Sequence, residues 1–258
     1  MNEVHVLPRD TSVKIHQAKM RVAVRRTLQV ATVLLLGLGI GFASTPAQAQ
    51  VELKPGIRVG VTAAGLGGDE EEFVDGFGQA LLVSPNVTSV ELETKARTGF
   101  TAGGFVVVDF VGPFAIQPEF RYIQRGYRID FELSNGIQTA TVEGTLKFDY
   151  IDIPVLARYD IPAPGFTPHL LAGPTLGFNV NSEFEADGPA GTNTEDLSDG
   201  TSSTDFGLEF GAGVGFGLGG STLSVDLRYG IGLSDINEES GDISLQNRAF
   251  MITAGFAF

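Results

Sequence analysis

Residues 204–236 read TDFGLEFGAGVGFGLGGSTLSVDLRYGIGLSDI and alternate apolar with small or charged side chains over two strand lengths. A period of two residues indicates β-strands, because successive side chains of a strand point to opposite faces. The face opposite the apolar one carries glycines mixed with charges. Apolar residues outside and small or polar residues inside are typical of a transmembrane barrel. The apolar face comprises Phe206, Leu208, Phe210, Ala212, Val214, Phe216, Leu218, Leu223, Val225, Leu227, Tyr229, Ile231 and Leu233.

The first 49 residues are expected to be a secretory signal peptide. Three arginines precede an apolar run at 27–42, and small residues follow it. Ala47-Gln48-Ala49 fits a signal-peptidase site, which places cleavage before Gln50. Met20 is a possible true start, because residues 1–19 do not resemble the start of a signal peptide. The alternative is an anchor that stays attached, although a run of about 16 apolar residues is short for a spanning helix.

Charge and cysteine usage exclude several classes of protein. Without residues 1–49, 11 Lys and Arg remain against 29 Asp and Glu, a net charge of −18. Nucleic acid is therefore not an expected partner. The chain has no cysteine, which excludes disulfides, thiolate metal sites, thiol catalysis and a lipidated N-terminal cysteine. The remaining 50–258 segment has the length of one all-β domain.

The sequence predicts eight strands joined alternately by short and long connections. Barrels of the outer membrane have short periplasmic turns and long outer loops, so both termini are expected in the periplasm. The expected fold is an all-β, eight-stranded antiparallel transmembrane barrel. The strands are expected at 54–64, 99–111, 114–122, up to 161 for the fourth, 167–180, 204–218, 223–234 and 248–258, with outer loops at 65–98, 124–148, 181–203 and 235–247.

The second of these loops carries a hairpin signal. Asn135-Gly136 is a favoured two-residue turn. The third and fourth strands are therefore candidates to protrude beyond the membrane as a ribbon through Phe131 and Val142. An irregular loop is the alternative.

The chain ends in an amphipathic strand whose last residue is phenylalanine. Outer-membrane barrels commonly end in this way, because the assembly machinery reads such a C-terminal strand. Phe256 and Phe258 are the expected assembly signal, and the machinery is an expected partner. The alternative is a strand that merely reaches the terminus.

Three segments resemble the PorT-like outer-membrane β-barrels of Bacteroidota, which are small eight-stranded barrels of the OmpX/OmpA type. They are IDIPVLARYDI (151–161), PHLLAGPTLGF (168–178) and LSVDLRYGIGLSDI (223–236). The resemblance covers about 54–258. It implies the barrel fold but no shared catalytic motif. One namesake of the family takes part in protein secretion.

The inward face of the expected barrel carries eight charges that are candidate structural lumen residues. They could line a narrow channel, with rings of charge selecting ions, or pair with one another. Eight strands leave an interior that side chains fill, and an unpaired buried charge is costly, so the sequence favours pairing. The inward glycines make room either for large side chains or for a file of water. The eight residues are Arg58, Glu119, Arg121, Asp152, Arg158, Glu209, Asp226 and Arg228.

An enzyme reading depends on His169, the one histidine after residue 49. Outer-membrane lipid-modifying enzymes and proteases need a general base near the outer rim. His169 follows the short turn at 162–166, at the periplasmic end. We expect it to face Arg158, diagonal to Asp160, and to pair inside the barrel. No catalytic, cofactor or metal site is predicted.

The expected outer loops concentrate carboxylates. One interpretation is divalent-cation binding between these loops and lipopolysaccharide phosphates. The other is a solvated acidic surface, which the lack of an EF-hand spacing favours. The residues are Asp69, Glu70, Glu71, Glu72, Asp75, Glu91 and Glu93, then Glu183, Glu185, Asp187, Glu195, Asp196 and Asp199, then Asp235, Glu238, Glu239 and Asp242.

These patterns together predict a non-enzymatic protein of the outer membrane of a Gram-negative bacterium, with a structural or surface-interaction role through its outer loops. Outer-membrane lipid and lipopolysaccharide would surround it as a monomer. Three alternatives stay open. They are a porin-like narrow transport channel, an accessory of protein secretion, and a lipid-modifying enzyme for which the sequence offers no rim constellation.

Overall fold

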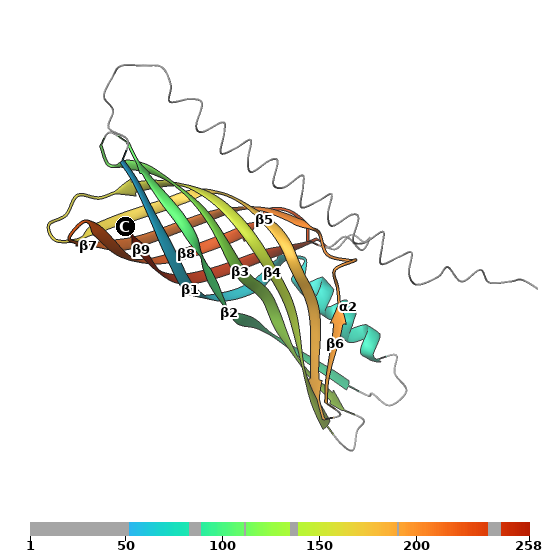
Figure 1. The fold of residues 1–258 in the computed structure, drawn as a ribbon. Helices are drawn as coiled ribbons and strands as arrows, with labels where there is room; N and C mark the ends of the chain where they lie inside the picture. Colours follow the sequence, from blue (N-terminus) through green and yellow to red (C-terminus); the bar gives the residue numbers. More distant parts are fainter. Residues whose placement is uncertain (1–51, 83–88, 111, 135–138, 190, 237–243) are drawn as a thin grey trace, which may run out of the picture. The chain divides into compact units, whose positions relative to one another are not determined.

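The computed structural model describes residues 52–82, 89–110, 112–134, 139–189, 191–236 and 244–258 (Figure 1). Eight antiparallel strands form a closed ring in the order β4-β3-β2-β1-β9-β8-β7-β5, and β5 pairs back onto β4. The all-β, eight-stranded fold predicted from the sequence is confirmed. The strands are β1 (Glu52–Gly68), β2 (Ser89–Asp109), β3 (Phe114–Ser134), β4 (Thr139–Asp160), β5 (Thr167–Gly188), β7 (Thr204–Leu218), β8 (Ser221–Gly232) and β9 (Leu245–Ala257).

The first and last barrel strands complete the ring. β1 and β9 pair from Gly56↔Ala257 to Gly68↔Leu245 without a register shift. A closed sheet leaves no strand edge in the membrane, where an unpaired backbone group would lack water as a partner. In the described part of the chain, no helix is long and apolar enough to cross a membrane.

The two faces of the sheet have opposite character. On β8, Val225 and Leu227 are exposed, whereas Ser224, Asp226 and Arg228 are buried. The same alternation holds on β1, β3 and β9, so apolar side chains cover the outside of the ring and polar ones the inside. This is the pattern of a barrel whose solvent is lipid.

One end of the barrel carries only short connections, and we call it the short-turn end. The links at 110–113, 161–166 and 219–220 lie there. Gly219 and Gly220 have φ values of +62° and +105°, a conformation that side chains rarely adopt. The opposite end, which we call the long-loop end, carries the remaining connections.

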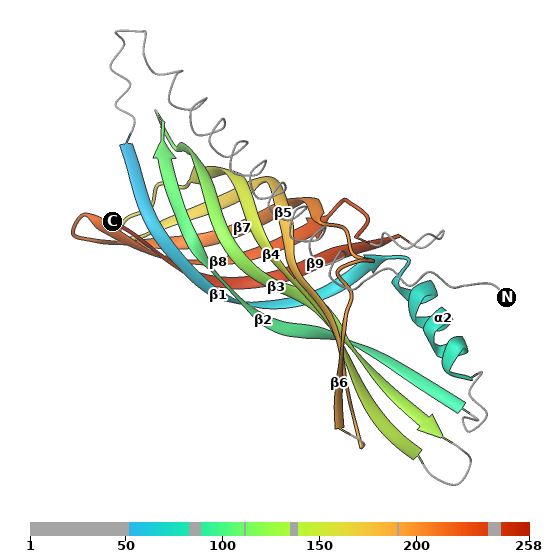
Figure 2. The same cartoon turned by 45° about the vertical axis from the view of Figure 1, so that its right-hand side comes forward.

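The long-loop end is more regular than the sequence predicts. β2, β3, β4 and β5 are 21 or 22 residues long, about twice the length that spans a bilayer. They continue beyond the ring as an open sheet, and β6 (Gly191–Asp196) adds to β5. We call this sheet the extension (Figure 2). Among the described residues, much of the outer loops expected at 65–98, 124–148 and 181–203 is therefore strand, because the outward face there turns charged while the strand period continues.

Phe131 pairs with Val142, so β3 and β4 form a two-stranded ribbon in the extension. Of the two predictions for this region, the protruding ribbon is confirmed and the irregular loop is not. The Asn135-Gly136 turn itself lies outside the described residues. Helix α2 (Glu70–Leu82), between β1 and β2, was not predicted. Its sequence, EEEFVDGFGQALL, repeats apolar residues at helical spacing after an acidic start, and Val74 is buried.

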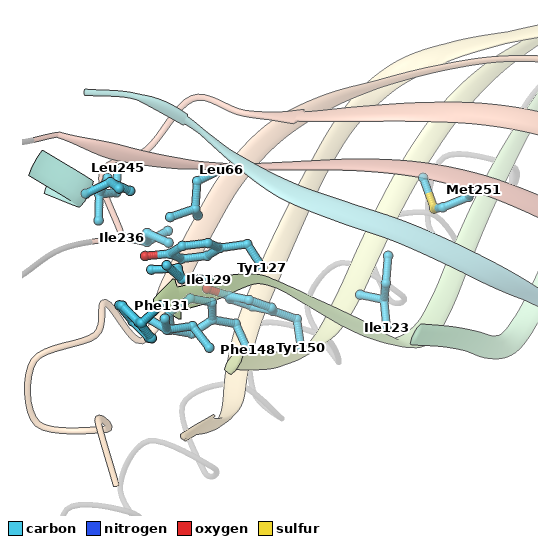
Figure 3. Close-up of a cluster of buried hydrophobic side chains, with 12 residues drawn as sticks. Leu66, Ile123, Tyr127, Ile129, Phe131, Phe148, Tyr150, Ile236, Leu245 and Met251 are labelled. Atoms are coloured by element: carbon cyan, nitrogen blue, oxygen red, sulfur yellow. The ribbon is translucent and has the colours of Figure 1, made fainter. Parts of the chain in front are cut away.

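An apolar cluster closes the long-loop end from inside (Figure 3). Tyr127, Ile129 and Phe131 of β3 pack with residues of β4 and with the segments that follow β1 and β8. The cluster gives the inner face of the extension a core of its own, so this sheet buries apolar surface without lipid. Its buried members are Leu66, Val74, Ile123, Tyr127, Ile129, Phe131, Leu146, Phe148, Tyr150, Ile236, Leu245 and Met251.

A charge on the outer face of the barrel should block insertion. Leu227 is half exposed at the middle of β8, opposite Ala212 and Ile252. Leu227→Arg should destabilise the folded barrel by roughly 2–4 kcal/mol, the cost of arginine at the bilayer midplane. Leu227→Phe, which keeps an apolar group there, is the matched control. The measurement is folding into liposomes over a urea series; an equal loss in both variants would contradict the assigned outer face.

Candidate functional site

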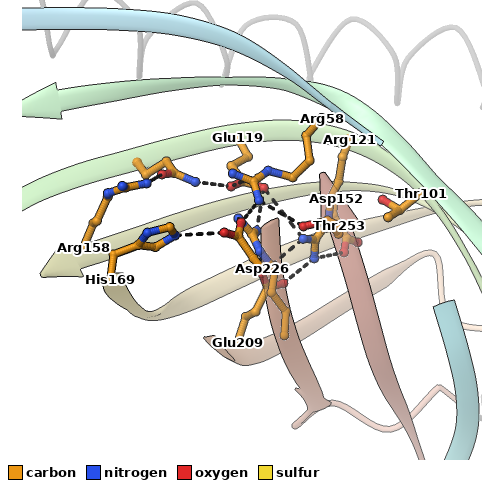
Figure 4. A network of polar contacts seen from close by, with 12 residues as sticks. Arg58, Thr101, Glu119, Arg121, Asp152, Arg158, His169, Glu209, Asp226 and Thr253 are labelled. Carbon is orange, nitrogen blue, oxygen red and sulfur yellow. Dashed lines mark hydrogen bonds and ion pairs between the residues drawn. The ribbon is translucent and has the colours of Figure 1, made fainter. Parts of the chain in front are cut away.

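The inner face of the barrel holds a network of ion pairs (Figure 4). All eight charges singled out in the sequence lie there, and none is more than 8% exposed. They come from β1, β3, β4, β7 and β8, strands that meet only when the ring closes.

Arg228 lies at the centre of this network. Its Nη1 donates to Glu119 Oε2 and Glu209 Oε1, each at 3.0 Å. Its Nη2 donates to Asp226 Oδ2 at 2.9 Å. One guanidinium therefore joins carboxylates from β3, β7 and β8, and the charge-assisted bonds offset the desolvation of the groups that form them.

Arg121 carries the network toward the long-loop end. It binds Glu209 through both terminal nitrogens and Asp152 through Nη2, the latter at 3.2 Å. Its Nη1 lies 3.7 Å from Glu119 Oε2. Glu209 is thus shared between Arg121 and Arg228, so the two arginines act as one unit.

Arg58 joins the network from β1. It pairs with Asp226 and donates from Nη1 to Thr253 Oγ1 at 3.0 Å. Its guanidinium also lies over the Phe105 ring, 4.8 Å from the centroid, a favourable cation–π arrangement. These contacts link β1 to β8 and β9 across the interior.

Two further members were not singled out in the sequence. Arg125 donates from Nη2 to Asp152 at 2.6 Å and from Nη1 to Asp205 Oδ2 at 3.1 Å. The third strand was expected to end near residue 122, which placed Arg125 in a loop. Its odd number is the signal that could have found it, because odd positions of β3 point inward. Asp205 likewise shares the parity of Glu209 on β7.

The observed register between β4 and β5 gives His169 other neighbours than the sequence predicted. Asp160, not Arg158, pairs directly with His169, and Arg158 pairs with Leu171. His169 Nε2 lies 2.8 Å from Asp226 Oδ1. Arg158 donates to Asp160 at 2.8 Å and to Gln117 at 3.1 Å. A histidine held in this way is part of the packing at the short-turn end.

Glycine provides the space for several of these contacts, and Gly213 shows it best. A Cβ on Gly213 would lie 2.2 Å from Asp226 Oδ1 and 2.6 Å from His169 Nε2. The side chains of the network therefore occupy this space, as packing rather than a file of water requires.

Apolar side chains close the lumen at both ends. Phe105, Val107, Ala115 and Ala257 form a small buried cluster at the short-turn end. The larger cluster around Tyr127 and Phe131 closes the long-loop end. The ion pairs are consequently enclosed, and removing one partner of such a pair typically costs about 3–5 kcal/mol.

The other candidate residues lie on the outside. Phe258 is 59% exposed, and its ring meets that of Phe256 edge to face at 5.3 Å. Many acidic residues assigned to outer loops lie instead on strands of the extension, such as Glu185 on β5 and Glu195 on β6. In the ranges that the structure describes, no group of three or more histidine and carboxylate side chains is arranged to hold a metal.

Three solved structures are similar to this chain over most of its length. The crystal structure of Neisserial surface protein A (NspA) has 13% identity and a TM-score of 0.40, covering 79% of this chain and 95% of that one. The attachment invasion locus protein Ail of Yersinia pestis has 15% identity and a TM-score of 0.36, with coverages of 80% and 99%. OprG from Pseudomonas aeruginosa has 10% identity and a TM-score of 0.37, with coverages of 82% and 98%.

No curated protein sequence matches the chain. Residues 47–238, most of the sequence, match the family described as outer membrane protein beta-barrel domain. The matched region includes every barrel strand except β9. The chain therefore belongs to the outer membrane protein beta-barrel domain family.

Proposed function

We propose that this outer-membrane barrel is a non-enzymatic surface-interaction protein whose extension projects from the cell and binds a positively charged partner. In this proposal both termini and the short-turn end lie in the periplasm. The observation that carries it is the outer face of the extension, which is a regular, strongly acidic sheet surface.

The outer face of the extension carries nine carboxylates and three basic residues. The inner face of the same strands packs in the apolar cluster, so the charges all face away from it. Such a surface attracts cationic partners over a Debye length and repels anionic ones. The carboxylates are Glu91, Glu93, Asp130, Glu132, Glu143, Glu183, Glu185, Asp187 and Asp196, and the basic residues are Lys95, Arg128 and Lys147.

One row of this face sets four carboxylates directly opposite one another. Glu93 pairs with Asp130, Asp130 with Glu143, and Glu143 with Asp187. Like charges directly opposite on neighbouring strands destabilise a sheet. Lys95, which lies 2.6 Å from Asp130 and 3.1 Å from Glu93, and Arg128, 3.8 Å from Glu143, offset only part of this repulsion. A cationic partner would relieve the rest.

The lumen supports the same proposal because neither a conduction path nor a catalytic constellation is favoured there. The charges that could select ions are bonded to one another across the interior. His169 is buried against Asp226 at the short-turn end, with no hydroxyl nucleophile among its hydrogen-bond partners. The extension is therefore the better candidate for the functional surface.

Planar-bilayer recordings test the channel alternative. The purified protein should insert without stable, porin-sized conductance steps, because paired side chains fill the cross-section of the lumen. A heat-unfolded sample controls for leakage caused by detergent. Large reproducible steps from the folded protein would favour the transport function instead.

Single-cysteine labelling tests the orientation, since the chain has no cysteine of its own. Thr194 lies on exposed β6 of the extension, and Pro164 lies in an exposed turn of the short-turn end. Each is replaced by cysteine in a separate variant. A membrane-impermeant maleimide should label Thr194→Cys on intact cells and Pro164→Cys only after lysis. The reverse result would place the extension in the periplasm.

A cationic probe tests the acidic face. A fluorescent decalysine peptide should bind proteoliposomes carrying the barrel, and added salt should weaken the binding. The variant Glu93→Gln/Glu143→Gln/Asp187→Asn should lose about tenfold in affinity, as expected from a few exposed charge pairs. Glu52→Gln, an exposed carboxylate at the other end, is the matched control. Binding that survives the triple variant unchanged would exclude this face.

A further inference from the structure

The barrel contains a small hollow near the long-loop end of the ion-pair network. Its wall is formed by β5, β7, β8 and β9 and by Arg125 of β3. Thr175 pairs with Gly207, and Gly207 pairs with Gly232, so two adjacent inward positions carry no side chain. The space that remains is about that of one water molecule. We call it the glycine hollow.

Three oxygen atoms of residues that line the glycine hollow have no hydrogen-bond partner within the described chain. They are Thr175 Oγ1, Asp205 Oδ1 and Asn247 Oδ1. Their residues are 6%, 3% and 1% exposed. Buried polar atoms are nearly always paired, so each of these atoms indicates a missing partner.

The orientation of the Asn247 amide shows which kind of partner is missing, namely a cation or a hydrogen-bond donor. Its Nδ2 donates to Tyr150 Oη at 3.1 Å and to Asp205 Oδ2 at 3.0 Å. Both amide hydrogens are thereby used, and Oδ1 can only accept. Asp205 Oδ2 also accepts from Arg125 at 3.1 Å, which leaves Oδ1 as the free end of the carboxylate.

The connected network as a whole has an excess of negative charge. The guanidinium of Arg125 is the cation that pairs with Asp205, and Asp152 shares it. Across the connected network, four arginines face five carboxylates. These are Arg58, Arg121, Arg125 and Arg228 against Glu119, Asp152, Asp205, Glu209 and Asp226.

We propose that the glycine hollow binds one monovalent metal cation, which is sodium in an ordinary saline medium. Carboxylate, amide and hydroxyl oxygens are the ligands that hard cations take. One positive charge would make the network neutral. A water molecule would leave its net charge negative, and a divalent ion would make it positive. The cation would hold β5, β7 and β9 together at the point where the network meets the apolar cluster. This inference is independent of the proposed surface role.

The test compares the unfolding temperature of the full-length, detergent-purified protein in sodium chloride and in choline chloride at equal ionic strength. Sodium should raise the temperature in a saturable way, because it binds the folded state. Thr175→Val and Asp205→Asn should each weaken the apparent sodium affinity by at least about tenfold, as loss of a metal-site group does. The readout is the difference between the two salts, which a merely structural role of these residues would not change.

Two control variants separate the hollow from other sites. Ser224→Ala removes a buried inward hydroxyl at the short-turn end, and Glu185→Gln removes an acid of the extension. Both should keep the sodium effect. Equal unfolding temperatures of the wild type in both salts would mean that the hollow holds water only. A sodium effect that survives in Thr175→Val and Asp205→Asn, or disappears in Glu185→Gln, would also overturn the proposal.

Discussion

Closure of the sheet through β1 and β9 is the constraint on which the other features depend. In hydrocarbon every backbone N–H and C=O must find a partner within the protein, and only a closed ring gives each strand two neighbours. Closure also brings five strands that are distant in sequence around one narrow interior. Arg58 near the start of the domain and Thr253 near its end become hydrogen-bond partners for this reason.

The narrow interior then dictates what its side chains must do. A charge that points inward is removed from water, so it is tolerated only where opposite charges surround it. Arg228 and Arg121 meet this condition by sharing Glu209, and Arg125 meets it through Asp152 and Asp205. Because each guanidinium bridges two or more strands, the network resists separation of the strands.

The extension shows the same strand period in a different solvent. Within the membrane the outer face is apolar and the inner face charged, whereas in the extension the inner face is apolar and the outer face acidic. β3 spans this inversion, from exposed Phe120 to buried Phe131, without a register shift against β4. One continuous strand therefore serves as a lipid-facing wall at one end and, at the other, as part of the extension, whose inner face packs in the apolar cluster.

The sequence by itself determined the strand period, the eight barrel strands, the short-turn end and the inward parity of charges such as Asp226 and Arg228, because alternation is a local property of the chain. It did not determine which charges meet. Register shifts in β2 between Ala96 and Thr101 and in β4 at Asp149 and Tyr150 displace neighbours by amounts that no local pattern records. Only the tertiary structure decided that His169 lies against Asp226, that Arg125 pairs with Asp152 and Asp205, and that the strands continue beyond the membrane, because these depend on contacts between strands far apart in sequence.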